Sequence, residues 1–303
     1  MKDVAVVLIG LNSCNYVRGA LKSLLAAQWR DCTYELIYVD NGSRDNTRAM
    51  LADFPQVRTI FNDRNLGFCK AGNQAAAIAD SRYLFFLNDD TLVIGDAICL
   101  LKEFLDSTPE AAVAGSRLLY PDMSEQWSGR RFATPLNAIF GRRSLLSRMF
   151  PEAAPVRAYV YKDEVRAGVP FVVDWVSAAA MMVRREAFDR AGGLVEDYYY
   201  FHESVFCDRI HKAGGKNYLL PQSKIIHYEG KGSGPRPLAS RIWHVKNFHI
   251  GAYRFYCEYH GLTPLDPRRY FAAALMSVRA LLMVVAHSIT CVQQAVTTSG
   301  KTA

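Results

Sequence analysis

The sequence lacks the two commonest glycine-rich motifs that bind phosphate groups. It contains neither GxGxxG nor GxxxxGKS/T, and the first apolar run is followed instead by residues 10–13 (GLNS). Without the first motif a dinucleotide-dependent oxidoreductase is disfavoured, and without the second a P-loop enzyme is excluded. Any phosphate-containing ligand must therefore be bound by other means.

The cysteines give no sign of a disulfide framework or a zinc site. They number seven, with no CxxC pair and no regular spacing, which is typical of a reducing compartment. The apolar N-terminal stretch, residues 1–12, is too short for a signal peptide and lacks a small-residue cleavage site. We therefore expect a cytoplasmic protein with buried thiols.

Charge is also sparse. Charged residues make up 21% and hydrophobic residues 50% of the 303-residue chain, so the sequence can bury a full core and is not of the disordered class. The net charge of +7 suits an anionic partner such as nucleotide phosphates or lipid head groups. Because Lys and Arg are scattered and no nucleic-acid-binding motif occurs, no nucleic-acid partner is expected.

Strand and helix patterns alternate along the first 115 residues. Apolar stripes at helical spacing predict packed helices, and the first of them contains Val17, Ala20, Leu21, Leu24 and Leu25. Short apolar runs predict buried strands at residues 4–9, 35–39, 57–61, 83–87 and 111–115. This alternation is typical of an α/β fold with a parallel sheet and right-handed crossovers.

Polar residues gather where the predicted strands end. Asn12 follows the first strand, and the next three strands end in residues 40–43 (DNGS), 65–68 (NLGF) and 88–90 (NDD). Ligands of open α/β sheets bind at this edge, where Asp40 is suited to accept hydrogen bonds from a base or ribose. Each segment alone is more often a turn or helix cap. Four of them in register indicate a ligand site.

The pair Asp89-Asp90 points to a cation. Adjacent carboxylates directly after a buried strand are costly unless a positive group lies beside them, commonly a divalent cation with the phosphates that it neutralises. Capping of the next helix is the competing explanation for an isolated pair. The sequence thus predicts a metal–phosphate site at the end of the fourth strand.

Six segments carry a resemblance to a known family: VDNGSRDNT (39–47), DRNLGF (63–68), LNDDT (87–91), VDWVSAAAMMVRREAFDRAGG (173–193), HKAGG (211–215) and IIHYEGKGS (225–233). In this order they resemble the inverting family 2 glycosyltransferases, and within them the bacterial rhamnosyltransferase-like branch. The resemblance covers residues 4–233. It implies a GT-A fold, with a Rossmann-like and mostly parallel central sheet flanked by helices.

The same resemblance implies a division of the chain. We expect a GT-A domain over residues 1–235, with a nucleotide-binding half at 1–115 and an acceptor and catalytic half at 116–235. Residues 236–303 are expected to form a C-terminal helical extension that associates with a membrane.

The resemblance also assigns roles to the strand ends. The acid matching Asp90, with its neighbour, binds a divalent cation on the donor diphosphate, here expected to be Mg²⁺ or Mn²⁺. His227 stands where the family has a histidine, so it is expected either to contact the metal or diphosphate or to be structural. The predicted donor-binding residues are Asn12, Asp40, Asn41, Asn65, Gly67 and Asp89.

Inversion needs a single general base for the acceptor hydroxyl, and Glu203 is the best match to the family's base. The family usually has a second acid beside this position, whereas His202 and Ser204 flank it here. In the competing explanation Glu203 is a solvated helix residue paired with Arg209. The substitute acids are Asp208 and Glu196, and the residues expected to shape the acceptor side are Trp175, Ser177 and the tyrosines at 198–200.

The predicted activity is transfer of a sugar, with rhamnose as the leading candidate, from a dTDP- or UDP-sugar to a glycan or a polyprenyl-diphosphate-linked acceptor in cell-envelope glycan synthesis. Two alternatives remain open. One is a non-catalytic paralogue that binds nucleotide-sugars or assists an active transferase. The other, a sugar-nucleotide nucleotidyltransferase, is less favoured because Asn12 stands where that class has a basic glycine-rich loop.

Two stretches point to a membrane surface, the basic segment 141–150 and the apolar segment 270–296. Arg279 near the middle of the second would cost about 2.5–3.5 kcal/mol at a bilayer centre. An interfacial helix, or a helix packed in a homo-oligomer, is favoured over a membrane span, and a helix docked on its own domain explains the pattern as well. The expected location is the cytoplasm, peripheral at the cytoplasmic face of the inner membrane.

Overall fold

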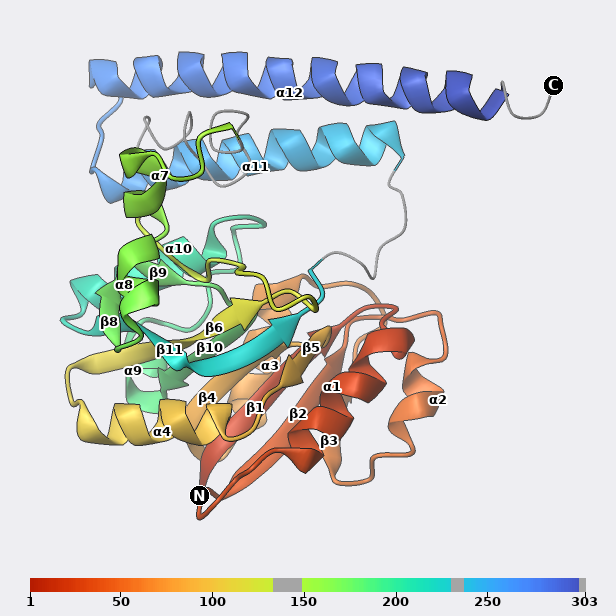
Figure 1. The fold of residues 1–303 in the computed structure, drawn as a ribbon, viewed down its shortest axis with the longest axis vertical. Helices are drawn as coiled ribbons and strands as arrows, with labels where there is room; N and C mark the ends of the chain where they lie inside the picture. Colours follow the sequence, from red (N-terminus) through yellow and green to blue (C-terminus); the bar gives the residue numbers. More distant parts are fainter. Residues whose placement is uncertain (133–148, 230–236, 300–303) are drawn as a thin grey trace. The chain divides into compact units, whose positions relative to one another are not determined.

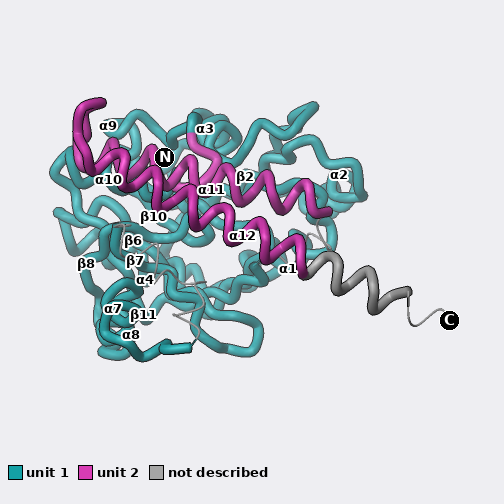
Figure 2. Tube along the Cα trace, turned by 90° about the horizontal axis from the view of Figure 1, so that it is seen from above, with its two compact units in different colours: residues 1–132, 140–197, 202–232 teal, residues 133–139, 198–201, 233–303 magenta. Residues whose placement is uncertain are grey.

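The computed structural model describes residues 1–132, 149–229 and 237–299, with side chains as far as residue 289. The chain divides into two compact units (Figure 2). Unit 1 holds nearly all of the chain up to Gly232, and unit 2 holds the C-terminal helices together with Tyr198–Phe201. The predicted boundary at residue 235 and most of the basic segment 141–150 lie outside the described residues.

The alternation predicted for the first part of the chain is confirmed (Figure 1). The predicted stripe on the first helix is buried at Val17, Ala20, Leu21 and Leu24, because these residues share the face that packs on the sheet. The elements are β1 (Lys2–Gly10), α1 (Cys14–Ala26), β2 (Tyr34–Asp40), α2 (Thr47–Leu51), β3 (Val57–Phe61), α3 (Phe68–Ile78) and β4 (Ser81–Asn88).

The rest of unit 1 adds shorter and more varied elements. They are β5 (Thr91–Val93), α4 (Ala97–Ser107), β6 (Ala111–Leu119), β7 (Gly129–Arg130), α7 (Ala154–Tyr159), α8 (Lys162–Ala167), β8 (Phe171–Val173), β9 (Trp175–Val176), β10 (Ala180–Arg184), α9 (Arg185–Arg190), α10 (His202–Lys212) and β11 (Lys216–His227). Among the described residues the central sheet has nine strands, in the order β3-β2-β1-β4-β10-β6-β11-β5, with β8 beside β11.

The sheet changes character at β10. Strands β3, β2, β1 and β4 are parallel, as predicted, whereas β10 runs antiparallel between β4 and β6. In the parallel part Gly10 is in register with Asp40 of β2, and Ile9 with Asn88 of β4. The carboxyl ends of these strands therefore meet at one edge, which brings their polar loops together.

The core of unit 1 lies on both faces of the sheet. On one face, helices α1 and α4 cover Val4, Val6 and Leu8 of β1, which are fully buried. On the other face, Phe86 of β4 packs on Phe188 of α9 with ring centroids 5.7 Å apart. Burial on both faces explains why the first strand is apolar without alternation.

Unit 2 is built on two long helices, α11 (Leu238–Tyr259) and α12 (Pro267–Ser299), which lie side by side. The segment Tyr198–Phe201 packs on α11: the Tyr200 hydroxyl lies 2.7 Å from His244 Nδ1, and Phe201 stacks on Phe255. Gly251 permits this contact, since a Cβ there would lie 3.1 Å from the carbonyl oxygen of Tyr200.

Arg184 at the end of β10 fastens the antiparallel strand to its neighbours. Its guanidinium donates to the carbonyl oxygens of Ala111 (2.7 Å), Thr108 (3.1 Å) and Leu105, and it approaches the hydroxyl of Tyr83. A single side chain thus satisfies carbonyls at the end of α4 and the start of β6, groups that are costly to leave unpaired.

We expect Arg184→Met to lower the free energy of unfolding by about 2–4 kcal/mol, because the apolar side chain keeps the packing but removes the charged hydrogen bonds to these three carbonyls. Urea denaturation followed by circular dichroism measures the change. The control is Arg190→Met, at an exposed position on α9, which should be near neutral. Equal stability of the two variants would contradict the role given to Arg184.

Candidate active site

Asn12 joins the loops that follow β1 and β2. Its backbone N–H donates to Ser43 Oγ (2.8 Å), and its side-chain oxygen accepts from the backbone N–H of Arg44 (2.8 Å). Asn12 adopts a left-handed backbone, with φ +53°, which asparagine tolerates better than most residues. This predicted donor residue is exposed, at the edge where the strands end.

Asp40 is fully buried at the end of β2. Arg48 of α2 donates to its carboxylate (2.6 Å) and also to the carbonyl oxygen of Asn62 (2.6 Å), while its guanidinium covers the ring of Phe61. Arg48 could not be predicted from the sequence, because a lone arginine in a polar helix has no motif. Its partly exposed side chain covers the buried carboxylate of Asp40.

Asn41 organises the loop after β3 with its side-chain amide. The nitrogen donates to Asn65 Oδ1 (3.1 Å) and to the carbonyl oxygen of Gly67 (3.2 Å), and the oxygen accepts from Asn62 and from the backbone of Leu66. These bonds occupy the amide, so Asn41 positions the loop. Asn65 is exposed and Gly67 has φ +83° with open space where a Cβ would be, so these two offer the accessible surface.

Asp89 lies in a cluster with Ser13 and Tyr38. The Tyr38 hydroxyl is 3.0 Å from Ser13 Oγ and donates to Asp89 Oδ2 at 3.3 Å. Gly10 makes this cluster possible, since a Cβ there would lie 1.9 Å from the Tyr38 hydroxyl and 2.0 Å from Asp89 Oδ2. Desolvation, with a further contribution from the charge of Asp90, raises the pKa of Asp89 to about 7.

Asp90 and His227 are brought together by the pairing of β5 with β11. Asp90 Oδ1 lies 3.1 Å from His227 Nε2, and His227 Nδ1 lies 2.8 Å from the side-chain oxygen of Gln126. The Gln126 nitrogen donates to the carbonyl oxygen of His227, which fixes the orientation of the amide and makes Nδ1 the donor. Nε2 lies beside both the Asp90 carboxylate and the side-chain amide of Asn88, whose nitrogen is 3.2 Å away.

This arrangement fits a divalent cation. A carboxylate oxygen and an imidazole nitrogen are both ligand types for divalent cations. Donors on neighbouring vertices of an octahedral site, about 2.1 Å from the ion, lie about 3 Å apart, which matches the observed 3.1 Å. The described residues contain no group of three or more His, Cys, Asp or Glu that could hold an ion, so the other ligands would be diphosphate oxygens and water.

Glu203 lies in the first turn of α10, half-buried, with Oε2 at 3.4 Å from His202 Nε2. The ring of His202 contacts Phe68, the residue after Gly67, with centroids 5.2 Å apart. The start of α10 thus lies beside the loop after β3, which contains Gly67. Arg209 donates to the carbonyl oxygen of Ala191 at 3.4 Å.

The substitute acids are placed differently. Asp208 is buried and paired with Lys212 at 2.7 Å, and Glu196 is exposed and accepts a hydrogen bond from Asn73. Ser204 is 2% exposed, so it faces the protein interior. Of these residues, Glu203 alone combines an accessible carboxylate with closeness to the loop after β3.

Comparison with known proteins identifies the family. The model of Glycosyl transferase family 2 matches residues 5–192. The chain belongs to this family. It is therefore a glycosyltransferase, as the sequence motifs predicted.

Relatives extend the likeness beyond the matched region. The glycosyltransferase is 26% identical over 298 residues to N-acetylglucosaminyl-diphospho-decaprenol L-rhamnosyltransferase of Mycobacterium tuberculosis, covering 94% of each chain. It is 34% identical over 246 residues to the succinoglycan biosynthesis protein ExoO of Rhizobium meliloti, covering 80% of this chain and 65% of ExoO.

The fold is GT-A, as predicted. A mannosyltransferase of Pyrobaculum calidifontis, solved with GDP-Man and Mn²⁺, matches with a TM-score of 0.59 at 15% identity, over 100% of this chain and 82% of that one. TarS of S. aureus, solved with UDP-GlcNAc, matches with a TM-score of 0.55 at 14% identity, over 90% and 70%.

The residues expected on the acceptor side of the glycosyltransferase divide between the two units. Trp175 is 8% exposed, donates to the carbonyl oxygen of Arg131 and lies under the guanidinium of Arg130. Ser177 is half-buried and accepts a long hydrogen bond from the backbone of Ala179. Tyr198–Tyr200 belong to unit 2, where Tyr199 packs edge-on against Trp243.

The raised pKa of Asp89 predicts a pH dependence of the metal-free protein. Between about pH 4 and pH 7 the folded state retains a proton that the unfolded state has released, so the free energy of unfolding falls as pH rises through this window. We expect Asp89→Asn to flatten this decline, because the amide carries no charge to desolvate.

Urea midpoints measured across this range without divalent cations test the expectation. The control is Asp63→Asn, an exposed acid on the loop after β3, which should leave the slope unchanged. A slope that is the same in the wild type and in Asp89→Asn would remove Asp89 as its source.

Proposed function

We propose that the protein is a metal-dependent, inverting glycosyltransferase that moves a sugar from a nucleotide-diphosphate donor to a lipid-linked or polysaccharide acceptor. The observation that carries the proposal is the pair Asp90–His227, a carboxylate oxygen and an imidazole nitrogen that lie 3.1 Å apart. The loops holding Asn12 and Asn65 are at the same edge of the sheet as the metal pair, as a nucleotide diphosphate requires.

Asp90 and His227 would hold Mg²⁺ or Mn²⁺, with Asp89 in support. The ion would neutralise charge that builds on the diphosphate leaving group. Gln126 keeps the Nδ1 proton of His227 in place and so orients the Nε2 lone pair. Two of the solved structures with this fold contain Mn²⁺, which supports a divalent cation.

Glu203 would act as the general base. An inverting transfer proceeds by one in-line attack, so the acceptor hydroxyl needs a carboxylate within hydrogen-bond reach and no second carboxylate as nucleophile. The half-buried side chain at the start of α10 and its closeness to the donor loop support this role. His202, at 3.4 Å, is the titratable neighbour that faces the carboxylate.

The substrates are proposed from the relatives. The name of the M. tuberculosis relative gives rhamnose as the sugar and a decaprenyl-diphosphate-linked acceptor, so we propose a dTDP- or UDP-linked donor, rhamnose foremost, and a polyprenyl-diphosphate-linked or glycan acceptor. A cytoplasmic location is supported by six cysteines in the described part of the chain that are all free thiols. Thermal-shift screening of dTDP-, UDP- and GDP-sugars with each cation would identify the donor.

Replacement of the metal ligand should abolish catalysis. We expect Asp90→Ala to lose Mn²⁺-dependent turnover of the donor, because the variant lacks the carboxylate that would bind the ion. Gln126→Met should weaken the ion's apparent affinity about 10–100-fold and restore activity at higher Mn²⁺, since it disturbs only the orientation of His227. Initial rates over a Mn²⁺ titration distinguish the two, with Asp63→Ala as the control, and unaltered metal dependence in Asp90→Ala would refute the site.

Replacement of the base should separate binding from transfer. We expect Glu203→Gln to keep the donor-induced thermal shift and to lose about 10²–10⁴-fold in transfer rate, because the amide cannot accept the acceptor's proton. Asp208→Asn and Glu196→Gln serve as matched controls and should retain transfer. Full transfer by Glu203→Gln would exclude it as the base, whereas donor binding without any turnover by the wild type would favour the non-catalytic alternative.

A further inference from the structure

One face of α12 is apolar and exposed along most of its length. Phe271, Val278, Leu282, Val285 and Ile289 recur at helical spacing and are each between 47% and 66% exposed. We call these five residues the α12 stripe. A stripe of this size that is open to solvent is unusual in a globular protein and marks an interaction surface.

Another side of α12 packs on α11 and holds Arg279. Ala272 and Met276 are buried there, and the Arg279 guanidinium lies 3.0 Å from His249 Nε2 and over the ring of Phe248. Residues 267–299 contain no Asp or Glu. The α12 stripe is therefore free of charge, and its helix carries only positive charge.

The contacts of Arg279 favour one orientation of α12 at a membrane. By length and composition alone, Pro267–Ile289 is long and apolar enough to cross a bilayer, with a mean hydropathy of 1.8. Crossing would pull Arg279 away from His249 and Phe248 into hydrocarbon, where arginine is expensive. A helix lying in the plane of the interface keeps those contacts and buries only the α12 stripe.

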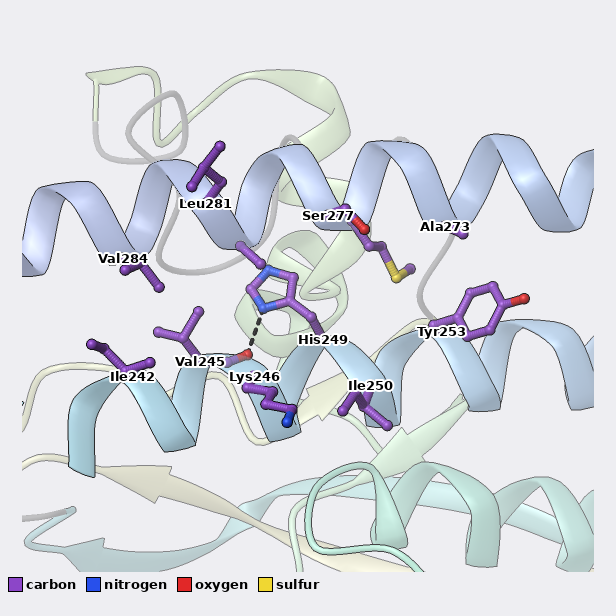
Figure 3. A pocket seen from close by; sticks show the side chains of 12 residues that line it. Ile242, Val245, Lys246, His249, Ile250, Tyr253, Ala273, Ser277, Leu281 and Val284 are labelled. Carbon is purple, nitrogen blue, oxygen red and sulfur yellow. Dashed lines mark hydrogen bonds between the residues drawn. The ribbon is translucent and has the colours of Figure 1, made fainter. Parts of the chain in front are cut away.

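An apolar groove of about 470 Å³ adjoins the α12 stripe (Figure 3). It lies between α11 and α12, where Ile242 and Val245 point toward Val284. Its lining also includes Lys246, Ile250, Ala273 and Leu281. Leu281 is 64% exposed, and on the helix surface it adjoins Val278 and Val285 of the stripe, three and four residues away. The apolar surface thus extends from the α12 stripe toward α11.

Charge favours one occupant for this surface. Residues 238–289 contain six Lys and Arg against two Asp and Glu, so they carry more than half of the chain's net charge of +7. Two copies meeting through this region would bring like charges together, whereas anionic lipid head groups would complement them.

We propose that α11 and α12 dock the glycosyltransferase on an anionic phospholipid bilayer. The α12 stripe enters the boundary between head groups and acyl chains, and exposed basic side chains such as Lys246 on the groove contact lipid phosphates. This binding does not depend on catalysis, so the proposal and the proposed activity fail separately.

A pair of valine substitutions tests the surface. Val278→Ser with Val285→Ser alters the α12 stripe, and Val169→Ser with Val172→Ser in unit 1 is a matched control, because the valines are 58% and 47% exposed in the first pair and 57% and 47% in the second. Co-sedimentation of the full chain uses vesicles of phosphatidylcholine alone or mixed with phosphatidylglycerol. Equal thermal melting of all three proteins establishes that each is folded.

We expect the wild type and the control pair to sediment with the mixed vesicles, and the α12 pair to bind about tenfold more weakly or less. Binding should also fall with added salt and without phosphatidylglycerol, because part of the attraction is electrostatic. No binding by the wild type, or equal loss in both pairs, would overturn the proposal. A wild-type dimer that the α12 pair dissociates, without vesicle binding, would assign the stripe to a second copy.

Discussion

The parallel pairing of β1 with both β2 and β4 is the constraint on which the donor site depends. Because the backbone register sets Gly10 against Asp40 and Ile9 against Asn88, the carboxyl ends of three strands meet at one edge. Segments far apart in sequence then supply Asn12, the Asn41 network and Asp89. Backbone hydrogen bonds at both ends of β1 hold this register, since the Lys2 N–H donates to the carbonyl oxygen of Asp80 and the carbonyl oxygen of Gly10 accepts from the Asn41 N–H.

Much of this arrangement could be predicted from the sequence, because periodicity and strand-end polarity are local signals. The strands up to β4 and the clustering of their polar ends followed from apolar runs and turn residues. The partners that tune the site could not be predicted. Arg48 beside Asp40 and Gln126 beside His227 reach the site from segments without a periodic pattern, and only the tertiary fold brings them within hydrogen-bonding distance.

Strand direction and residue roles in the second half of the chain were also harder to predict from the sequence. The antiparallel insertion of β10 depends on pairing between distant segments, and a short apolar run does not reveal its direction. The tyrosines at 198–200 pack with α11 in unit 2 through contacts such as Tyr200 with His244, and their place beside the acceptor stays a prediction. Aromatic residues serve equally in ligand contact and in helix packing, so their composition alone could not separate these roles.

The two glycines that border the strand-end loops resist substitution for different reasons. At Gly10 every added atom collides with Tyr38 and Asp89, so that position can vary only together with its neighbours. At Gly67 the space beside the backbone is open, but φ +83° combined with ψ 165° is a backbone conformation that essentially only glycine adopts. Efforts to alter donor preference would therefore keep both glycines and begin at Asn65, an exposed side chain two residues before Gly67.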